Sequence, residues 1–281
     1  GEVVTRAFAG IGRTIALELL EPDDMPRALR ARVGAPVVVV GGGDGTVGTA
    51  AAAFANSITA LAMLPLGTRN HLARQLGVPM DLAAAARVAV SGQRHRIDLG
   101  QAGSRVFVNN ASFGLYTRFV RGRDAARRTF AGTLRAAWDV VSHMRAQAFA
   151  LRIDGRRRDL FTPLLFIGNN EYALDLRSVG ERESLTDHHL SLLALHDQGP
   201  LDIARLAIKT LFGIAEHRRD FLEYGRACEI VIEGMGTIEG AFEGEVVVLP
   251  LPLHIRILPS ALGVVTPRDI ALPERALTHS H

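Results

Sequence analysis

The chain has 281 residues, of which 48% are hydrophobic and 22% charged, and its formal net charge is +3. This composition excludes a disordered or fibrous protein and predicts one large globular domain or two ordinary ones. Its one cysteine, Cys228, excludes a disulfide framework within the chain, and no apolar run approaches the ~20 residues needed to cross a bilayer. No signal peptide opens the sequence, so we expect a soluble cytoplasmic protein.

The first hundred residues predict alternating helices and strands. Two runs, 35–43 and 58–68, are apolar without alternation, which is typical of strands buried on both faces. Up to about residue 105 the alternation predicts a parallel sheet covered by helices. In chain order we expect helix 2–12, strand 13–20, helix 21–34, strand 35–43, helix 46–57, strand 58–68, helices 69–79 and 81–93, and strands within 94–114.

The pattern changes near residue 117. Residues 117–148 carry one apolar stripe at spacings of three, four and seven, and therefore predict a long helix. Short strand-like runs follow, with one more helix at 202–217, and they indicate a β-sandwich or barrel. The strands are expected within 149–160, 163–174, 190–197, 227–234, 240–250 and 253–267. We place the boundary between the two domains somewhere in 105–117.

A glycine-rich loop follows the strand at 35–43. The sequence Gly-Gly-Gly-Asp-Gly-Thr at 41–46 runs directly into a helix. Glycine lets a ligand approach the backbone, and the helix start offers free N–H groups and the positive end of its dipole. The glycine spacing does not fit the dinucleotide fingerprint. The loop does not fit the Walker A motif either, because that motif needs a lysine and the only lysine of the chain is Lys209. A tight turn without a ligand and an anion site both stay open at this point.

A second loop of the same kind follows the next strand. Residues 65–70 read Pro-Leu-Gly-Thr-Arg-Asn and again precede a helix. If the two strands are neighbours in a parallel sheet, both Gly-Thr pairs lie at the same edge, where open α/β sheets bind ligands. Two such loops favour a phosphate site more than either one alone. We expect Asp98, in "RIDLG", close to the same edge.

These motifs together resemble the diacylglycerol kinase catalytic domain family, the bacterial lipid kinases related to sphingosine kinases and, more distantly, to NAD kinases. The resemblance rests first on "GGGDGT" (41–46), "PLGTRNHLARQLG" (65–77) and "IDLG" (97–100). It continues over nearly the whole chain with "VNNASFGLY" (108–116), "GNNEYAL" (168–174), "LTDHHLSLLAL" (185–195) and "FEGEVVVLPLPLHIRILPSALGVVTP" (242–267).

The resemblance implies a fold of two domains with the active site in the cleft between them. Residues 1–108 would form an α/β nucleotide-binding domain, with three layers around a parallel sheet. Residues 109–260 would form a β-sandwich domain for the lipid substrate. For the C-terminal segment 261–281, a return to the first domain stays open. The family's opening strand, which ends in an Asn-Pro-x-x-Gly loop, is absent from this sequence, so either the sequence is truncated or the site is incomplete.

The resemblance also implies the cofactors ATP and Mg²⁺ and the residues that hold them. Asp44 would support the magnesium ion beside the phosphates, and Glu245 or Glu243 would accept the proton of the lipid hydroxyl. Residues expected to line the nucleotide site are Gly42, Gly43, Asp44, Gly45, Thr46, Val47, Gly48, Gly67, Thr68 and Asn70. Residues expected to support metal ions are Asp98, Ser184, Asp187 and His189, of which Ser184 and His189 would offer backbone carbonyls.

The sequence departs from the family pattern in four places. Gly48 and Thr49 stand where many members have Asn-Glu, and His71 stands where an acidic residue often lies. Glu243 replaces the usual aspartate of an Asp-Gly-Glu motif. "TDHH" at 186–189 replaces Asp-Asp-Gly, which keeps the aspartate but not the glycine. These departures affect the catalytic details more than the family resemblance.

The function we expect is an ATP-dependent lipid kinase. An NAD-kinase-like enzyme acting on a soluble substrate and a non-catalytic nucleotide- or lipid-binding protein stay open as alternatives. Residues 118–158 hold eleven arginines against three aspartates, so this segment is either a solvated helix face or a contact with an anionic membrane. We expect no nucleic-acid partner, and peripheral binding at the inner membrane face and a homodimer stay open.

Overall fold

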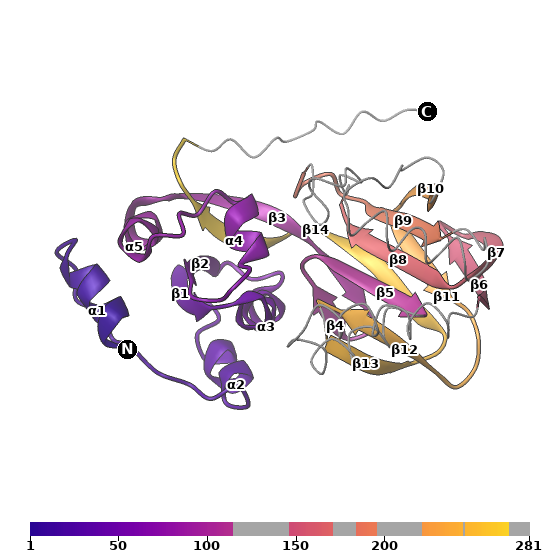
Figure 1. Cartoon of the computed structure of the whole chain (residues 1–281), viewed down its shortest axis with the longest axis horizontal. Coiled ribbons are helices and arrows are strands. Elements are labelled where there is room, and N and C mark those ends of the chain that lie inside the picture. The colour runs from indigo at the N-terminus through magenta and orange to yellow at the C-terminus, as the bar shows by residue number, and fades with distance from the viewer. Residues whose placement is uncertain (115–145, 171–183, 196–220, 244, 270–281) are drawn as a thin grey trace, which may run out of the picture.

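The computed structural model describes residues 1–114, 146–170, 184–195, 221–243 and 245–269 (Figure 1). The helix predicted at 202–217 and most of the one predicted at 117–148 lie outside these residues. The end of the latter prediction is wrong, because residues 147 and 148 begin a strand.

The described residues form a layered helical part and a larger all-β part. The helices are α1 (Glu2–Ala9), α2 (Met25–Arg30), α3 (Asp44–Phe54), α4 (His71–Gln75) and α5 (Leu82–Ser91). The strands are β1 (Val37–Gly42), β2 (Ala60–Pro65), β3 (Gln93–Ala102), β4 (Arg105–Phe107), β5 (Asn110–Gly114), β6 (Gln147–Ile153), β7 (Arg156–Thr162), β8 (Leu164–Asn169), β9 (Leu190–Leu195), β10 (Phe221–Ala227), β11 (Glu229–Ile232), β12 (Thr237–Phe242), β13 (Glu245–Pro250) and β14 (Leu253–Thr266).

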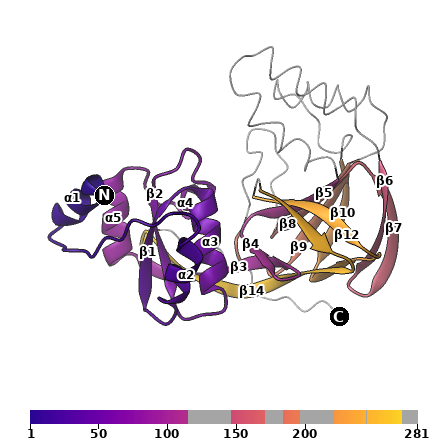
Figure 2. The same ribbon diagram turned by 90° about the horizontal axis from the view of Figure 1, so that it is seen from below.

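The helical part has three layers, as predicted. In β2, Leu61 and Met63 pack into the same core as Phe54 of α3. Ala60 and Ala62, which alternate with them, pack with Val88 of α5 on the opposite face. This alternation places helices on both faces of the sheet, as Figure 2 shows with α3 on one side and α5 on the other.

The sheet in this part is mixed rather than wholly parallel. β1 and β2 are parallel, and the C-terminal strand β14 is added parallel to β2. β3 then pairs with β14 in the antiparallel direction. The prediction of a parallel sheet from local alternation is therefore correct for β1 and β2 but wrong for β3, because β14 comes from the far end of the sequence.

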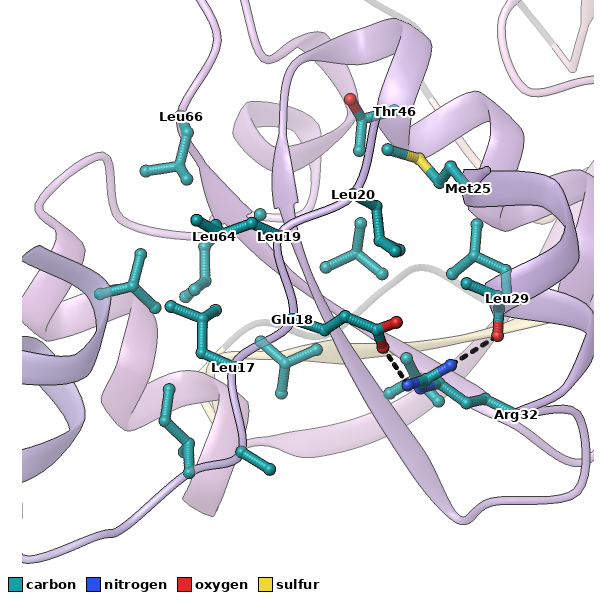
Figure 3. A pocket seen from close by; sticks show the side chains of 18 of the residues that line it. Leu17, Glu18, Leu19, Leu20, Met25, Leu29, Arg32, Thr46, Leu64 and Leu66 are labelled. Atoms are coloured by element: carbon teal, nitrogen blue, oxygen red, sulfur yellow. Dashed lines mark hydrogen bonds and ion pairs between the residues drawn. The ribbon is translucent and has the colours of Figure 1, made fainter. Parts of the chain in front are cut away.

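The prediction of a strand at 13–20 is wrong. The segment has no regular structure, and in Figure 3 it passes beside β1 as an irregular chain. Its apolar side chains remain accessible, with Leu17 42% exposed and Leu19 78% exposed. β1 bonds only to β2 among the described strands. An apolar pattern favours a strand, but a strand also needs backbone hydrogen bonds to a neighbour, and this segment forms none with the free edge of β1.

The all-β part is a sandwich of two sheets, and the first of these sheets continues into the helical part. One sheet has the order β1-β2-β14-β11-β6-β7, with β3 and β4 attached to β14, and the other has the order β10-β9-β8-β5-β12-β13. Their facing side chains form one core, in which Leu151 of β6 and Ile255 of β14 meet Phe113 of β5 and Ile167 of β8. The long strands β3 and β14 run from this core into the helical part and connect the two (Figures 1 and 2).

The division at residue 108 remains a proposal. No helix in the part of the chain that the structure describes is long and apolar enough to cross a membrane.

Candidate active site

The first glycine loop connects β1 to α3. Gly43 is the N-cap residue of α3, with extended backbone, and Asp44 begins the helix. A Cβ atom on Gly42 would lie 2.5 Å from the side chain of Thr46, so Thr46 folds back over this glycine. The first N–H groups of α3 have no partner within the helix, which makes this end suited to an anion.

The second loop lies directly against the first. Gly42 is opposite Pro65 in the parallel β1–β2 pair, so both loops leave the same edge of the sheet. A Cβ atom on Gly67 would overlap the backbone of Gly43. Asn70 has a left-handed backbone (φ 51°), and its side chain bonds both the N–H and the C=O of Gly67, at 3.0 and 2.7 Å. The structure thus brings together the two loops that the sequence placed at one edge.

Asp44 joins the two loops rather than pointing only to a ligand. Its Oδ1 accepts a 2.7 Å hydrogen bond from the backbone N–H of His71, the first residue of α4. Asp44 therefore fixes the start of α4 relative to the start of α3. Its Oδ2 has no hydrogen bond to the described residues and is the oxygen left for a cation.

Asp98 lies elsewhere and is fully buried. Its Oδ2 accepts from the backbone N–H of His188 at 2.8 Å. Its Oδ1 contacts His188 Nδ1 at 2.9 Å and accepts from the N–H of Ser260 at 2.7 Å. We expected Asp98 beside the glycine loops, but its bonds go to the 184–189 loop and to β14. The reason is that β14 lies between β2 and β3 in the sheet.

The 184–189 loop carries the other expected metal ligands. The N–H of Asp187 donates to Asn170 Oδ1 at 3.0 Å, and His189 Nδ1 contacts the carbonyl of Asp187 at 3.0 Å. Asp187 Oδ1 and His189 Nε2 are buried without hydrogen-bond partners in the described part of the chain. An unpartnered buried carboxylate oxygen fits a cation, since burying it alone is costly. Around it, however, the described residues hold no group of three or more acidic, histidine or cysteine side chains.

A hollow of about 430 Å³, with both apolar and charged side chains in its walls, lies between α3 and the turn that joins β12 to β13. Gly45, Gly48 and Thr49 line one side of it, and Glu243 and Glu245 line the other. The side chain of Glu245 is 69% exposed, and its Oε2 lies 2.5 Å from the guanidinium of Arg105. Both candidate glutamates therefore lie across this hollow from the glycine loop. We name the hollow the cleft.

The sequence analysis did not identify two residues that contact candidate site residues. Arg105, which pairs with Glu245, also lies over the ring of Phe242 at 5.7 Å, and no local sequence signal marks it. Asn169 is fully buried and donates to the carbonyls of Asp98 and Val108 at 2.9 and 2.8 Å. Its signal was "GNNEYAL", which carried the family resemblance without an assigned role.

A second hollow of about 640 Å³ lies on the other side of the glycine loop, between residues 15–20 and the free edge of β1 (Figure 3). Leucine, valine and methionine side chains form most of its wall, and Thr46 stands at one end. Its charged side chains, Glu18 and Arg32, form an ion pair with each other. This apolar cavity is larger than the cleft but offers little to hold a phosphate.

Sequence comparisons identify the first part of the chain. Residues 7–102 match the family "diacylglycerol kinase catalytic domain". The chain is 39% identical over 92 residues to the probable lipid kinase YegS of Escherichia fergusonii, an alignment that covers 31% of each protein. It is 23% identical over 255 residues to a diacylglycerol kinase of Staphylococcus aureus, which covers 87% of this chain and 78% of the relative.

Structural comparison extends the likeness over both parts. A crystal structure of a diacylglycerol kinase from Bacillus anthracis superposes with a TM-score of 0.64 at 19% identity, and covers 91% of this chain and 85% of the other. A second crystal structure from the same organism gives a TM-score of 0.71 at 22% identity. At such identities the likeness shows the fold alone, and it confirms the predicted two-part architecture.

Proposed function

Because residues 7–102 match the diacylglycerol kinase catalytic domain family, we propose that the chain is an ATP-dependent lipid kinase. It transfers the γ-phosphoryl group of ATP to the hydroxyl of a lipid such as diacylglycerol. The observation that carries this proposal is the cleft, in which Gly45 of the first glycine loop and the following turn of α3 face a solvent-accessible glutamate beside an arginine.

The glycine loops bind the nucleotide phosphates. The N–H groups at the start of α3, from Asp44 to Thr46, and that of Thr68 donate to phosphate oxygens. This arrangement needs no lysine, which agrees with the lack of one near the loop. The bonds from Asn70 to Gly67 hold the second loop in place, so little order has to be created when the nucleotide binds.

Glu245 accepts the proton of the lipid hydroxyl as that oxygen attacks the γ-phosphorus. The bond from the γ-phosphorus to the β–γ bridging oxygen breaks, and ADP leaves. General-base assistance of this kind is typically worth about 10²–10⁴-fold in rate. Arg105 orients the Glu245 carboxylate and adds positive charge beside the transferred group.

Magnesium is expected with ATP, where it neutralises charge on the phosphates. Asp44 Oδ2 is the carboxylate oxygen that fits this role. Asp187 Oδ1 fits a separate structural cation in the 184–189 loop. Asp98 does not fit a ligand role, since both of its oxygens already accept protein hydrogen bonds.

The decisive experiment is phosphate transfer from γ-labelled ATP by the full chain. The acceptor panel contains diacylglycerol, a sphingoid base, phosphatidylglycerol and a polyprenol, with NAD as the soluble acceptor. We expect label in at least one lipid and none in NADP. Labelled NADP alone would favour the kinase of a soluble substrate, and the absence of any labelled acceptor would contradict the proposal.

A non-catalytic nucleotide-binding protein is the second candidate. It is favoured by the engagement of Asp44 and Asp98 in hydrogen bonds within the protein. An ATP-induced rise in Tm without turnover on any acceptor would support it. Both candidate functions therefore predict ATP binding, but only the kinase predicts phosphate transfer.

Peripheral contact with an anionic membrane is part of the proposal. Within the basic segment 118–158, the structure describes residues 146–158, where Arg156, Arg157 and Arg158 are exposed on β7. Arg157 lies 3.3 Å from Asp159, an exposed ion pair that leaves the cationic surface only partly neutralised. Cosedimentation with vesicles containing phosphatidylglycerol, compared with neutral vesicles, tests this contact.

A further inference from the structure

Glu243 sits at the turn between β12 and β13 with a left-handed backbone (φ 52°). Its Oε1 accepts two backbone hydrogen bonds, from Val108 at 2.6 Å and from Asn109 at 3.0 Å. These two residues link β4 to β5. One oxygen of this carboxylate therefore fixes the β12–β13 turn to the β4–β5 connection.

The other oxygen of Glu243 reaches the opposite wall of the cleft. Oε2 lies so near Gly48 that a Cβ atom on that residue would overlap it. Gly48 stands within α3, where glycine is about 1 kcal/mol less favourable than alanine. Gly45, one turn earlier in the same helix, has nothing within 4 Å of its Cβ position. The close approach of Glu243 thus gives a physical reason for glycine at position 48 but not at position 45.

We propose that Glu243 and Gly48 form a spacer pair that sets the width of the cleft, and that Glu243 is a positioning residue rather than the base. The carboxylate spans from the β4–β5 connection to α3, and only a residue without a side chain lets it lie there. Glu245, two residues later, is then held opposite the glycine loop. This inference deepens the proposed function and, in its kinetic consequences, rests on it.

The surroundings of the two glutamates support this division of roles. A general base needs an accessible oxygen within reach of the substrate. Glu245 is largely exposed, and its Oε1 has no hydrogen bond to the described residues. Glu243 has one oxygen occupied by two N–H groups and the other against a helix. A side-chain amide at 243 still accepts both N–H bonds, whereas an amide at 245 cannot take a proton.

A double-mutant cycle tests the pair without any reference to catalysis. Gly48→Ala should give a Tm about 3 °C or more below that of Gly45→Ala, because the Glu243 carboxylate must move and strain its two hydrogen bonds to make room, whereas both variants gain the same helix propensity. Gly45→Ala adds the same methyl group to the same helix and should leave Tm unchanged or raise it slightly. Glu243→Asp shortens the side chain by one methylene, so Gly48→Ala added to it should cost much less Tm than Gly48→Ala alone. Equal Tm for the two alanine variants, or additive shifts in the cycle, would overturn the spacer pair.

The kinetic arm separates a positioning residue from a base. Glu243→Gln should retain turnover within about tenfold of the wild type, while Glu245→Gln should lose about 10²–10⁴-fold in kcat. Equal losses in the two variants would overturn the assignment of roles. If the wild type transfers no phosphate at all, the proposed function fails, but the Tm cycle still decides whether the spacer pair exists.

Discussion

The two hollows beside the glycine loop differ in chemistry although they share a wall. The apolar cavity is larger, about 640 Å³ against 430 Å³, yet its charged side chains neutralise each other. The cleft has Glu243, Glu245 and Arg105 around the start of α3. Size alone would select the apolar cavity as the active site, whereas the placement of ionisable groups opposite backbone N–H donors selects the cleft.

The largest expected effect lies in the cleft. Glu245→Gln should reduce kcat by about 10²–10⁴-fold, since the amide cannot accept the hydroxyl proton, and should leave the KM for ATP nearly unchanged. The matched control is Glu18→Gln, which makes the same change in the apolar cavity and should retain activity. Steady-state transfer of labelled phosphate measures both. A Glu245→Gln enzyme with the same kcat as the wild type would contradict the assignment of the cleft as the active site.

The contact between the two glycine loops should be the next most sensitive place. Gly67→Ala pushes a methyl group into the backbone of Gly43, and neither strand end can move freely. We expect a loss of about 1–3 kcal/mol in stability and weaker ATP binding. Thermal unfolding with and without ATP measures both quantities. Gly45→Ala serves as the stability control, because its Cβ meets open space.

Arg105 should separate activity from stability. Its ion pair with Glu245 and its contact with Phe242 are partly exposed, so Arg105→Ala should cost only about 1 kcal/mol or less. Turnover should fall by more than this figure implies, since the Glu245 carboxylate loses its orientation. Tm and kcat measured on the same preparation test the split. If kcat is unchanged, Arg105 has only a packing role.

The smallest effect is expected in the apolar cavity. Arg32→Ala removes the ion pair with Glu18 and one hydrogen bond to the carbonyl of Ala28. Half-exposed pairs of this kind are worth about 0–1 kcal/mol, so Tm should change little and kcat should not change. A large loss of activity would show that the apolar cavity takes part in the reaction and would reverse the comparison.

Local sequence patterns predicted the elements around the glycine loops well. The unbroken apolar runs before Gly41 and before Leu66 became neighbouring parallel strands. The predicted burial on both faces is correct for β2 but wrong for β1, in which Val39 is 40% exposed because the far edge of β1 is not covered by another described strand. The failure at 13–20 shows the limit of such patterns. Leu17 and Leu19 have the alternation of a strand, but this segment does not pair with the free edge of β1 beside it.

Long-range pairing explains the rest of what the sequence could not show. Gly263 of β14 pairs with Ala60 of β2, about two hundred residues away, and this insertion separates β3 from β2. Asp98 is thereby moved from the predicted nucleotide edge to a buried site beside His188. Arg105 similarly depends on the approach of the β12–β13 turn, which no sequence motif announces.

A crystal structure with a non-hydrolysable ATP analogue tests the central claim most directly. The phosphates should bind the N–H groups at the start of α3 and that of Thr68, with the γ-phosphoryl group in the cleft on the side of Glu245. Phosphates bound in the apolar cavity or at the 184–189 loop, with the cleft left to solvent, would contradict a phosphoryl transfer carried out by Glu245.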